Sequence, residues 1–153
     1  MYKMLRILFV VLMLSGLIMP LAVAGAQGST RTRVITEADI NSSYRVTNPA
    51  RRAITDVVVD LQPGQVVISS THVYANRSYD VVSVFTPTIT GGRVVWQAQS
   101  ITANGQAASQ ALVDQVNTSI MTSWRNYVRM QVSGRVQSIE ITDNEIIITR
   151  AGR

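Results

Sequence analysis

The side chains that could support catalysis are few and scattered in this sequence. His72 is the only histidine and cysteine is absent, which excludes histidine clusters for metals, thiol nucleophiles, thiolate sites and disulfides. A Ser–His–acid triad would have to use His72, but no Gly-x-Ser-x-Gly turn that exposes a nucleophilic serine occurs. The strand pattern around His72 instead predicts a surface or edge residue.

The nine acidic side chains fall mainly at predicted helix starts, turns and outer strand faces. Two carboxylates could perform glycoside hydrolysis, but the spacing singles out no pair. Asp143, Asn144 and Glu145 offer oxygen ligands for calcium, although a turn explains the same residues better. The sequence therefore predicts no catalytic residue, no metal site and no cofactor, and it favours a non-enzymatic protein.

Residues 1–26 have the composition of an export signal. Lys3 and Arg6 precede an apolar run over residues 7–14, and small residues follow Pro20. Signal peptidase requires small side chains before its cleavage site, so cleavage is predicted after Ala24 or Ala26.

The alternative is an uncleaved N-terminal membrane anchor, because residues 7–24 are barely long enough to span a bilayer. We expect an exported protein, secreted or held in the cell envelope. Residues 27–33 are polar and small and are predicted to be a flexible leader. A single domain is expected over residues 34–153, with enough chain to build a core without disulfides.

The positive charge of the chain is carried almost entirely by arginine. The formal net charge of +5 falls to +3 when Lys3 and Arg6 are removed, and Lys3 is the only lysine. A solvated surface explains this charge; the alternative is a weak attraction to anionic envelope polymers or lipid headgroups. Nucleic acid is not an expected partner, since no dense basic run with interleaved aromatic residues occurs.

One long amphipathic helix is predicted from about Ser109 to Met130. Its large residues recur at steps of three and four, which places them on one face; they are Leu112, Val113, Val116, Ile120, Trp124, Tyr127 and Val128. A helix of this length is about 33 Å long, and a nine-residue strand is about 30 Å long. The helix can therefore lie along the full length of a strand.

The rest of the chain has the alternation and turn residues of antiparallel strands. Four strands are predicted between Ile54 and Asn104, and turns are expected at residues 62–65, 76–78 and 91–92. A hairpin closed by Asp143 and Asn144 follows the long helix. Thr36 fits the cap of a short N-terminal helix. The predicted fold is α+β: an antiparallel four-stranded meander plus a C-terminal hairpin, wrapped around one long amphipathic helix.

Several strands carry apolar residues on both faces, for example Val57-Val58-Val59 and Ile146-Ile147-Ile148. One face can take the long helix. The other face needs the short helix, a partner chain or a lipid, unless these valines simply reflect the strand preference of valine.

Two segments carry a family resemblance. Thr36-Glu37-Ala38-Asp39-Ile40-Asn41 has the form of an s/t-E-x-x-Leu-Asn motif with isoleucine in place of leucine, and residues 104–109 form a Gly-containing turn before the long helix. With this order of elements, residues 34–149 resemble small exported bacterial envelope proteins of the tubular lipid-binding (TULIP-like) group, the relatives of the mycobacterial lipomannan elongation factor.

This resemblance implies a curved sheet around the helix, with an apolar groove between them that holds acyl chains. The groove candidates are Phe85, Trp96, Leu112, Val116, Ile120 and Trp124; the alternative is that they form an ordinary core. The expected function is an exported non-enzymatic binding protein for lipid or another apolar ligand. The alternative function is an envelope structural or protein-interaction module without a small-molecule ligand.

Overall fold

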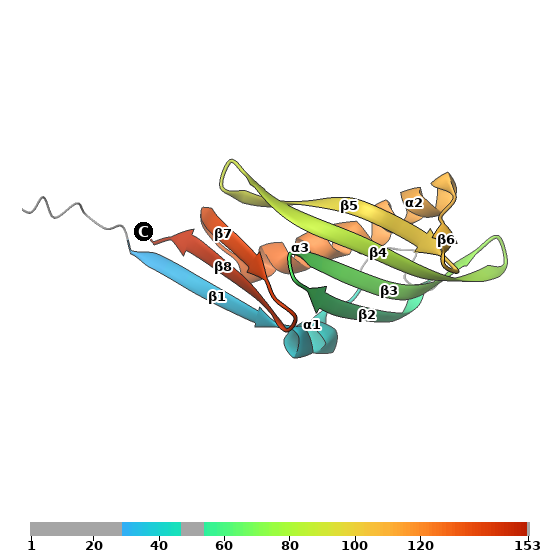
Figure 1. The fold of residues 1–153 in the computed structure, drawn as a ribbon, viewed down its shortest axis with the longest axis horizontal. Coiled ribbons are helices and arrows are strands. Elements are labelled where there is room, and N and C mark those ends of the chain that lie inside the picture. Colours follow the sequence, from blue (N-terminus) through green and yellow to red (C-terminus); the bar gives the residue numbers. More distant parts are fainter. Residues whose placement is uncertain (1–28, 47–53, 153) are drawn as a thin grey trace, which may run out of the picture.

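Two antiparallel sheets and one long helix make up the fold (Figure 1). The computed structural model describes residues 29–46 and 54–152. The predicted signal peptide and its cleavage sites lie outside these residues. Within the described part of the chain, no helix has the length and apolar character needed to cross a membrane.

The larger sheet has the strand order β2-β3-β4-β5-β6 and the smaller sheet the order β1-β8-β7. Their strands are β1 (Thr30–Thr36), β2 (Ile54–Gln62), β3 (Gln65–Tyr74), β4 (Arg77–Thr90), β5 (Arg93–Ala103), β6 (Gln106–Ala107), β7 (Val136–Ile141) and β8 (Glu145–Ala151). The helical segments are α1 (Glu37–Ser43), α2 (Gln110–Val116), the π-helical turn η2 (Asn117–Met121) and α3 (Thr122–Gln131).

The α+β class, the antiparallel pairing and the long helix are confirmed. The strand count differs from the prediction. The meander comprises β2 to β5, but the short β6 extends it to five strands. The hairpin of β7 and β8 is extended by β1 to a three-stranded sheet.

The prediction of a flexible leader over residues 27–33 is wrong for residues 30–33. These residues pair with Ile148 to Ala151 and open strand β1. The physical reason is that β8 offers an unpaired edge, and the alternating threonines and arginines of β1 fill it with main-chain hydrogen bonds. The ordered domain therefore begins before residue 34.

The short helix α1 closes the free edge of β2. Thr36 caps it by accepting a hydrogen bond from the Asp39 amide at 3.1 Å, as predicted. Asn41 then acts as a substitute strand: its Nδ2 donates to the Val59 carbonyl at 2.7 Å, and its Oδ1 accepts from the Val59 amide at 2.8 Å. Glu37 accepts from the Leu61 amide at 2.7 Å. The motif read from the sequence is thus a device that satisfies a sheet edge.

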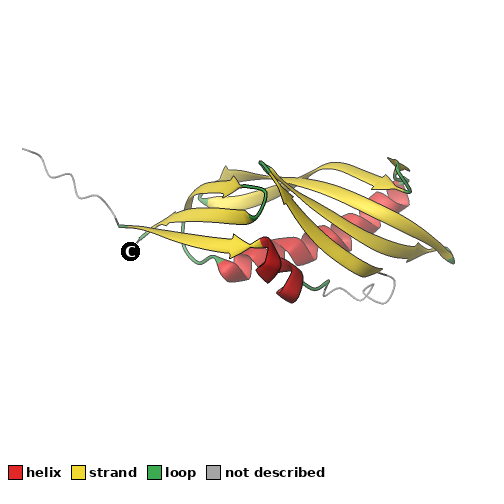
Figure 2. Cartoon of the chain, turned by 60° about the horizontal axis from the view of Figure 1, so that its bottom comes forward, coloured by secondary structure: helices red, strands yellow, loops and turns green. Residues whose placement is uncertain are grey.

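The long helix lies against one face of the sheets (Figure 2). It is not a regular α-helix, because the turn η2 interrupts it between α2 and α3. Buried residues recur every four positions, at Leu112, Val116, Ile120, Trp124 and Val128. Four residues of α-helix turn about 40° beyond a full circle, so such a row drifts around the helix. The wider π turn offsets part of that drift and keeps the row facing the sheet.

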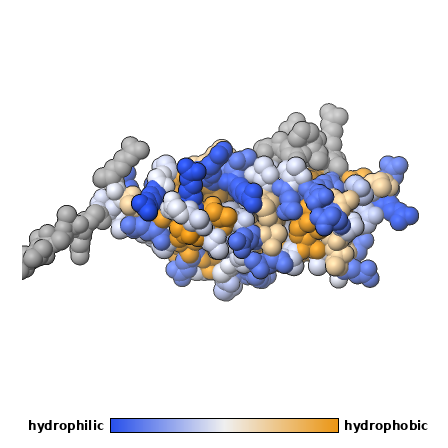
Figure 3. Space-filling view, turned by 90° about the horizontal axis from the view of Figure 1, so that it is seen from above, coloured by the Kyte–Doolittle hydropathy of each residue, from blue (hydrophilic) through white to orange (hydrophobic). Residues whose placement is uncertain are grey.

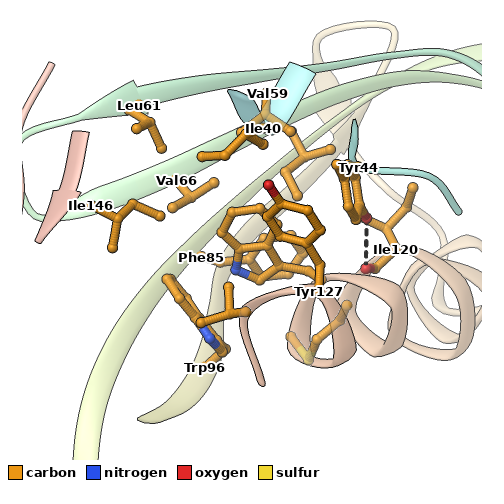
Figure 4. Packing of buried hydrophobic residues seen from close by; sticks show 14 of the residues in the cluster. Ile40, Tyr44, Val59, Leu61, Val66, Phe85, Trp96, Ile120, Tyr127 and Ile146 are labelled. Atoms are coloured by element: carbon orange, nitrogen blue, oxygen red, sulfur yellow. Dashed lines mark hydrogen bonds between the residues drawn. The ribbon is translucent and has the colours of Figure 1, made fainter. Parts of the chain in front are cut away.

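The core lies between this helix, α1 and the inner faces of both sheets (Figure 4). Tyr44, which follows α1, donates its hydroxyl to the Ile120 carbonyl at 3.1 Å in the π turn. Its ring meets Trp124 and Tyr127 edge-on, each with centroids 5.6 Å apart. Burial raises the pKa of the Tyr44 hydroxyl, so it stays a neutral donor.

Strand β7 joins the two sheets. The Gly64 amide in the β2–β3 turn donates to the Ile141 carbonyl at 3.0 Å, and the Val136 amide donates to the Gly92 carbonyl in the β4–β5 turn at 2.9 Å. Both ends of β7 are therefore fixed to turns of the larger sheet.

Candidate functional site

The six residues proposed from the family resemblance belong to the core. Each is at most 2% exposed, and all six belong to one apolar cluster. Trp96 and Trp124 meet at a centroid distance of 5.3 Å. Of the six, Trp96 is the one that also borders a groove, which is described next.

This groove lies where the long helix leaves the larger sheet, and we name it the β5–α3–β7 groove. Its volume is about 590 Å³. Its apolar lining consists of Val94, Trp96, Val128, Val132 and Val136. Seen from above, apolar surface in the half of the molecule that holds β7 and the β4–β5 hairpin is bordered by hydrophilic residues (Figure 3).

The local sequence explains the position of the groove. Val94 and Trp96 alternate with the exposed Val95, so both point to the inner face of β5. Helix α3 ends at Gln131, and Val132 is already extended. Gly134 then turns the chain into β7 with a φ of +98°. The helix therefore departs before the sheet ends, and the valines left behind line an open hollow.

Three arginines border this hollow: Arg93, Arg125 and Arg129. The Arg125 guanidinium donates to the Trp96 carbonyl at 3.3 Å. In the part of the chain that the structure describes, the guanidinium groups of Arg93 and Arg129 have no hydrogen-bond or ion-pair partner. No acidic residue belongs to the lining. The groove thus combines an apolar floor with an unneutralised cationic rim.

Four more arginines lie beyond the rim at the same end of the molecule. Arg31 faces Arg150 across β1 and β8, and Arg33 donates to Gln131 at 3.1 Å. Arg150 donates to the Ser133 carbonyl at 2.6 Å. Arg135 packs over Gly92 so closely that a Cβ atom added to Gly92 would lie 2.3 Å from the Arg135 side chain. Arg31, Arg150 and Ser133 border a smaller hollow of about 250 Å³.

We call these seven arginines together the arginine end. The nine acids of the chain all lie elsewhere, on α1, β2, the start of β4, α2 and the β7–β8 hairpin. The nine acids and the two remaining described arginines, Arg45 and Arg77, give the rest of the described chain a net charge of −7. The arginine end carries +7. The sequence showed the excess of arginine, but its separation from the acids depends on which strands meet.

His72 is not the surface or edge residue that the sequence analysis predicted. Its side chain is fully buried, and its Nε2 lies 3.0 Å from the Ser70 hydroxyl, itself 5% exposed. Burial lowers the pKa of His72, which keeps the ring neutral. The alternation from Val66 and Ile68 through Ser70 places His72 on the inner face of β3, so the sequence pattern itself indicates a buried histidine.

The Ser70–His72 contact does not form a catalytic triad in the described part of the chain. The His72 Nδ1 has no hydrogen-bond partner there. Both side chains face the core, so substrate cannot reach the serine oxygen. The described residues also contain no group of three or more histidine, aspartate or glutamate side chains that could hold a metal ion.

Comparisons with models of protein families, with curated proteins and with solved structures find no match to this chain. The resemblance to tubular lipid-binding proteins therefore stays a prediction.

Proposed function

We propose that this protein is an exported, non-enzymatic binding protein for a lipid or another apolar ligand, and that the ligand lies in the β5–α3–β7 groove. The observation that carries the proposal is the groove itself, about 590 Å³ in volume with a floor of four valines and Trp96. This volume falls in the range of small-molecule sites, about 300–1,000 Å³, which are mostly apolar and have a few polar groups that orient the ligand.

The position of the ligand differs from the one that the family resemblance implies. The helix–sheet seam is filled by Phe85, Leu112, Val116, Ile120 and Trp124, all at most 2% exposed. A filled seam supports a structural role for these residues. The groove begins where that packing ends, at Trp96, so a bound acyl chain would extend the row of core side chains outward.

The cationic rim favours a ligand with an anionic group at one end. Arg93 and Arg129 have no partner in the described residues, and their planar guanidinium groups match a carboxylate or phosphate. An apolar chain on the valines and an anionic group at the rim together describe an amphiphile such as a fatty acid.

Fluorescence quenching by a brominated fatty acid tests this proposal. Trp96 borders the groove, and the ring centroid of Trp124 lies 5.3 Å from that of Trp96. A bromine atom bound in the groove therefore quenches the tryptophan emission. Substituting Val94→Phe and Val132→Phe together fills the floor, and we expect the apparent affinity to fall at least tenfold. Mass spectrometry of an organic extract of the purified protein identifies the natural ligand.

The matched control is the pair Val58→Phe and Val95→Phe. These valines are 55% and 39% exposed on the outer face of the same sheet, so the same change in size there leaves quenching intact. The proposal fails if the brominated fatty acid leaves the emission of the unsubstituted protein unaltered. It also fails if both pairs of substitutions lower the apparent affinity for the fatty acid equally.

A second candidate function is an envelope module that binds another protein through the outer face of the larger sheet. Val58, Val73 and Val95 are exposed on or near that face, where a partner chain would remove them from water. Analytical ultracentrifugation checks this alternative, which predicts self-association or a stable complex. A monodisperse monomer without a copurifying protein contradicts it.

A further inference from the structure

The strongest unexplained feature of the molecule is the separation of its charges. Among the described residues, the arginine end carries seven arginines and no acidic side chain, while the acids gather on the rest of the domain. Ordinary surfaces mix the two signs. A one-signed end instead produces a field that attracts and orients the protein toward an anionic surface.

The chain before the domain enters at this same end. Ser29 hydrogen-bonds through its carbonyl to the Gly152 amide, next to Arg31 and Arg150. The sequence before Ser29 contains the apolar run that begins at Ile7. A membrane that held that run, before cleavage or without it, would be tethered to the domain through the end that carries the arginines.

We infer that the arginine end is a docking surface for a lipid bilayer rich in anionic headgroups. A bilayer fits it better than a compact anion, because the seven arginines belong to β1, β5, α3, β8 and the segment before β7, and these elements are spread across one end of the fold (Figure 1). Met130 is 76% exposed between Arg129 and Gln131, which gives this end an apolar side chain to insert at the interface.

Docking at this end would place the mouth of the β5–α3–β7 groove against the lipid. In this respect the inference extends the proposed function, because an amphiphile could then pass between bilayer and groove without crossing water. The docking itself does not require the groove to be filled.

Vesicle cosedimentation tests the docking surface. The chain from Gln27 onward, which contains the whole described core, is mixed with vesicles of pure phosphatidylcholine or of equimolar phosphatidylcholine and phosphatidylglycerol. We expect binding only to the latter, and loss of binding when salt rises from about 0.1 M to about 1 M, because the screening length falls from about 10 Å to about 3 Å.

Matched single substitutions locate the surface. Arg31→Gln and Arg77→Gln each remove one charge from an exposed arginine without a side-chain partner in the described residues. Arg77 begins β4, and the β3–β4 turn before it lies at the opposite end of the molecule from β1 (Figure 1). We expect Arg31→Gln to weaken vesicle binding about fivefold and Arg77→Gln to leave it nearly unchanged. Adding Arg135→Gln to Arg31→Gln should multiply the loss, and circular dichroism confirms that each variant is folded.

Three results would overturn the inference: equal binding to both kinds of vesicle, equal loss in Arg31→Gln and Arg77→Gln, or binding of heparin but not of vesicles. The last result would assign this end to a soluble anionic polymer. Quenching by the brominated fatty acid is measured on the same variants. Quenching without vesicle binding refutes the docking surface alone, whereas vesicle binding without quenching refutes the ligand groove alone.

Discussion

The contact between α1 and the edge of β2 gives the sharpest test of the fold, through the substitution Asn41→Ala. The Asn41 amide makes two hydrogen bonds to the main chain of Val59, at 2.7 and 2.8 Å. Each such bond contributes about 1 kcal/mol net. Alanine recovers about 0.5 kcal/mol through its higher helix propensity. The free energy of unfolding should therefore fall by about 1.5 kcal/mol.

Chemical denaturation measures this loss as a lower midpoint with an unchanged slope, because the surface exposed on unfolding hardly changes. For a domain of this size the melting temperature should drop by about 6 °C. Hydrogen exchange provides the local readout: the Val59 amide loses its acceptor and exchanges faster than its neighbours.

Ser42→Ala is the matched control on the same helix. The Ser42 hydroxyl bonds only within α1, to the Asp39 carbonyl at 2.8 Å, so its loss should change stability by less than about 0.5 kcal/mol. If Asn41→Ala is as stable as Ser42→Ala and the Val59 amide stays protected, the substitute-strand role of Asn41 is refuted.

Three further predictions follow from burial and backbone geometry. Burial lowers the pKa of His72 below its ordinary 6.5, so the unfolded chain binds the proton more readily than the folded one. The free energy of unfolding should therefore be at its full value above about pH 7 and fall as the pH drops below about 6.5. Denaturation midpoints measured across this range should lose that slope in His72→Gln, and a slope that persists contradicts the assignment. Ile120→Ala should lower the free energy of unfolding by about 2–5 kcal/mol in the absence of any ligand, because the Ile120 side chain is fully buried. The control Val58→Ala should lower it little, and equal losses in denaturant titrations would refute the core assignment. Gly64→Ala should lower the melting temperature, since a φ of +79° strains alanine although no atom lies within 4 Å of its Cβ; an unchanged melting temperature would show that the turn relaxes.

The local elements of this fold could be predicted because each depends on nearby residues. Thr36 and the acids after it specify the start of α1, and Pro63-Gly64 specifies the turn before β3. Strand β1 could not be predicted, because its partner β8 lies more than a hundred residues away. Thr-Arg-Thr-Arg is equally compatible with a loop until an unpaired edge is present.

The π turn in the long helix is indicated by the spacing of its apolar residues. The predicted range of the helix agrees with the observed one to within a residue at each end, yet the row from Leu112 to Val128 repeats every four residues. That period is too long for a regular α-helix, and the π turn at Asn117–Met121 accounts for it.

The groove was beyond the reach of the sequence. Its floor combines residues of β5, the end of α3 and the start of β7, and a pattern along one element cannot show where two elements diverge. Trp96 is the single sequence-derived candidate that borders it.

The way α1 covers the β2 edge also bears on self-association. An open edge strand pairs readily with another copy of itself, and here side chains of Glu37 and Asn41 occupy the hydrogen-bonding groups that a second chain would use. A variant that releases α1 would therefore do more than lose stability. It would present Val59 and Leu61 as a template for strand addition, so its aggregation should rise with protein concentration, whereas loss of a core contact elsewhere leaves this edge closed.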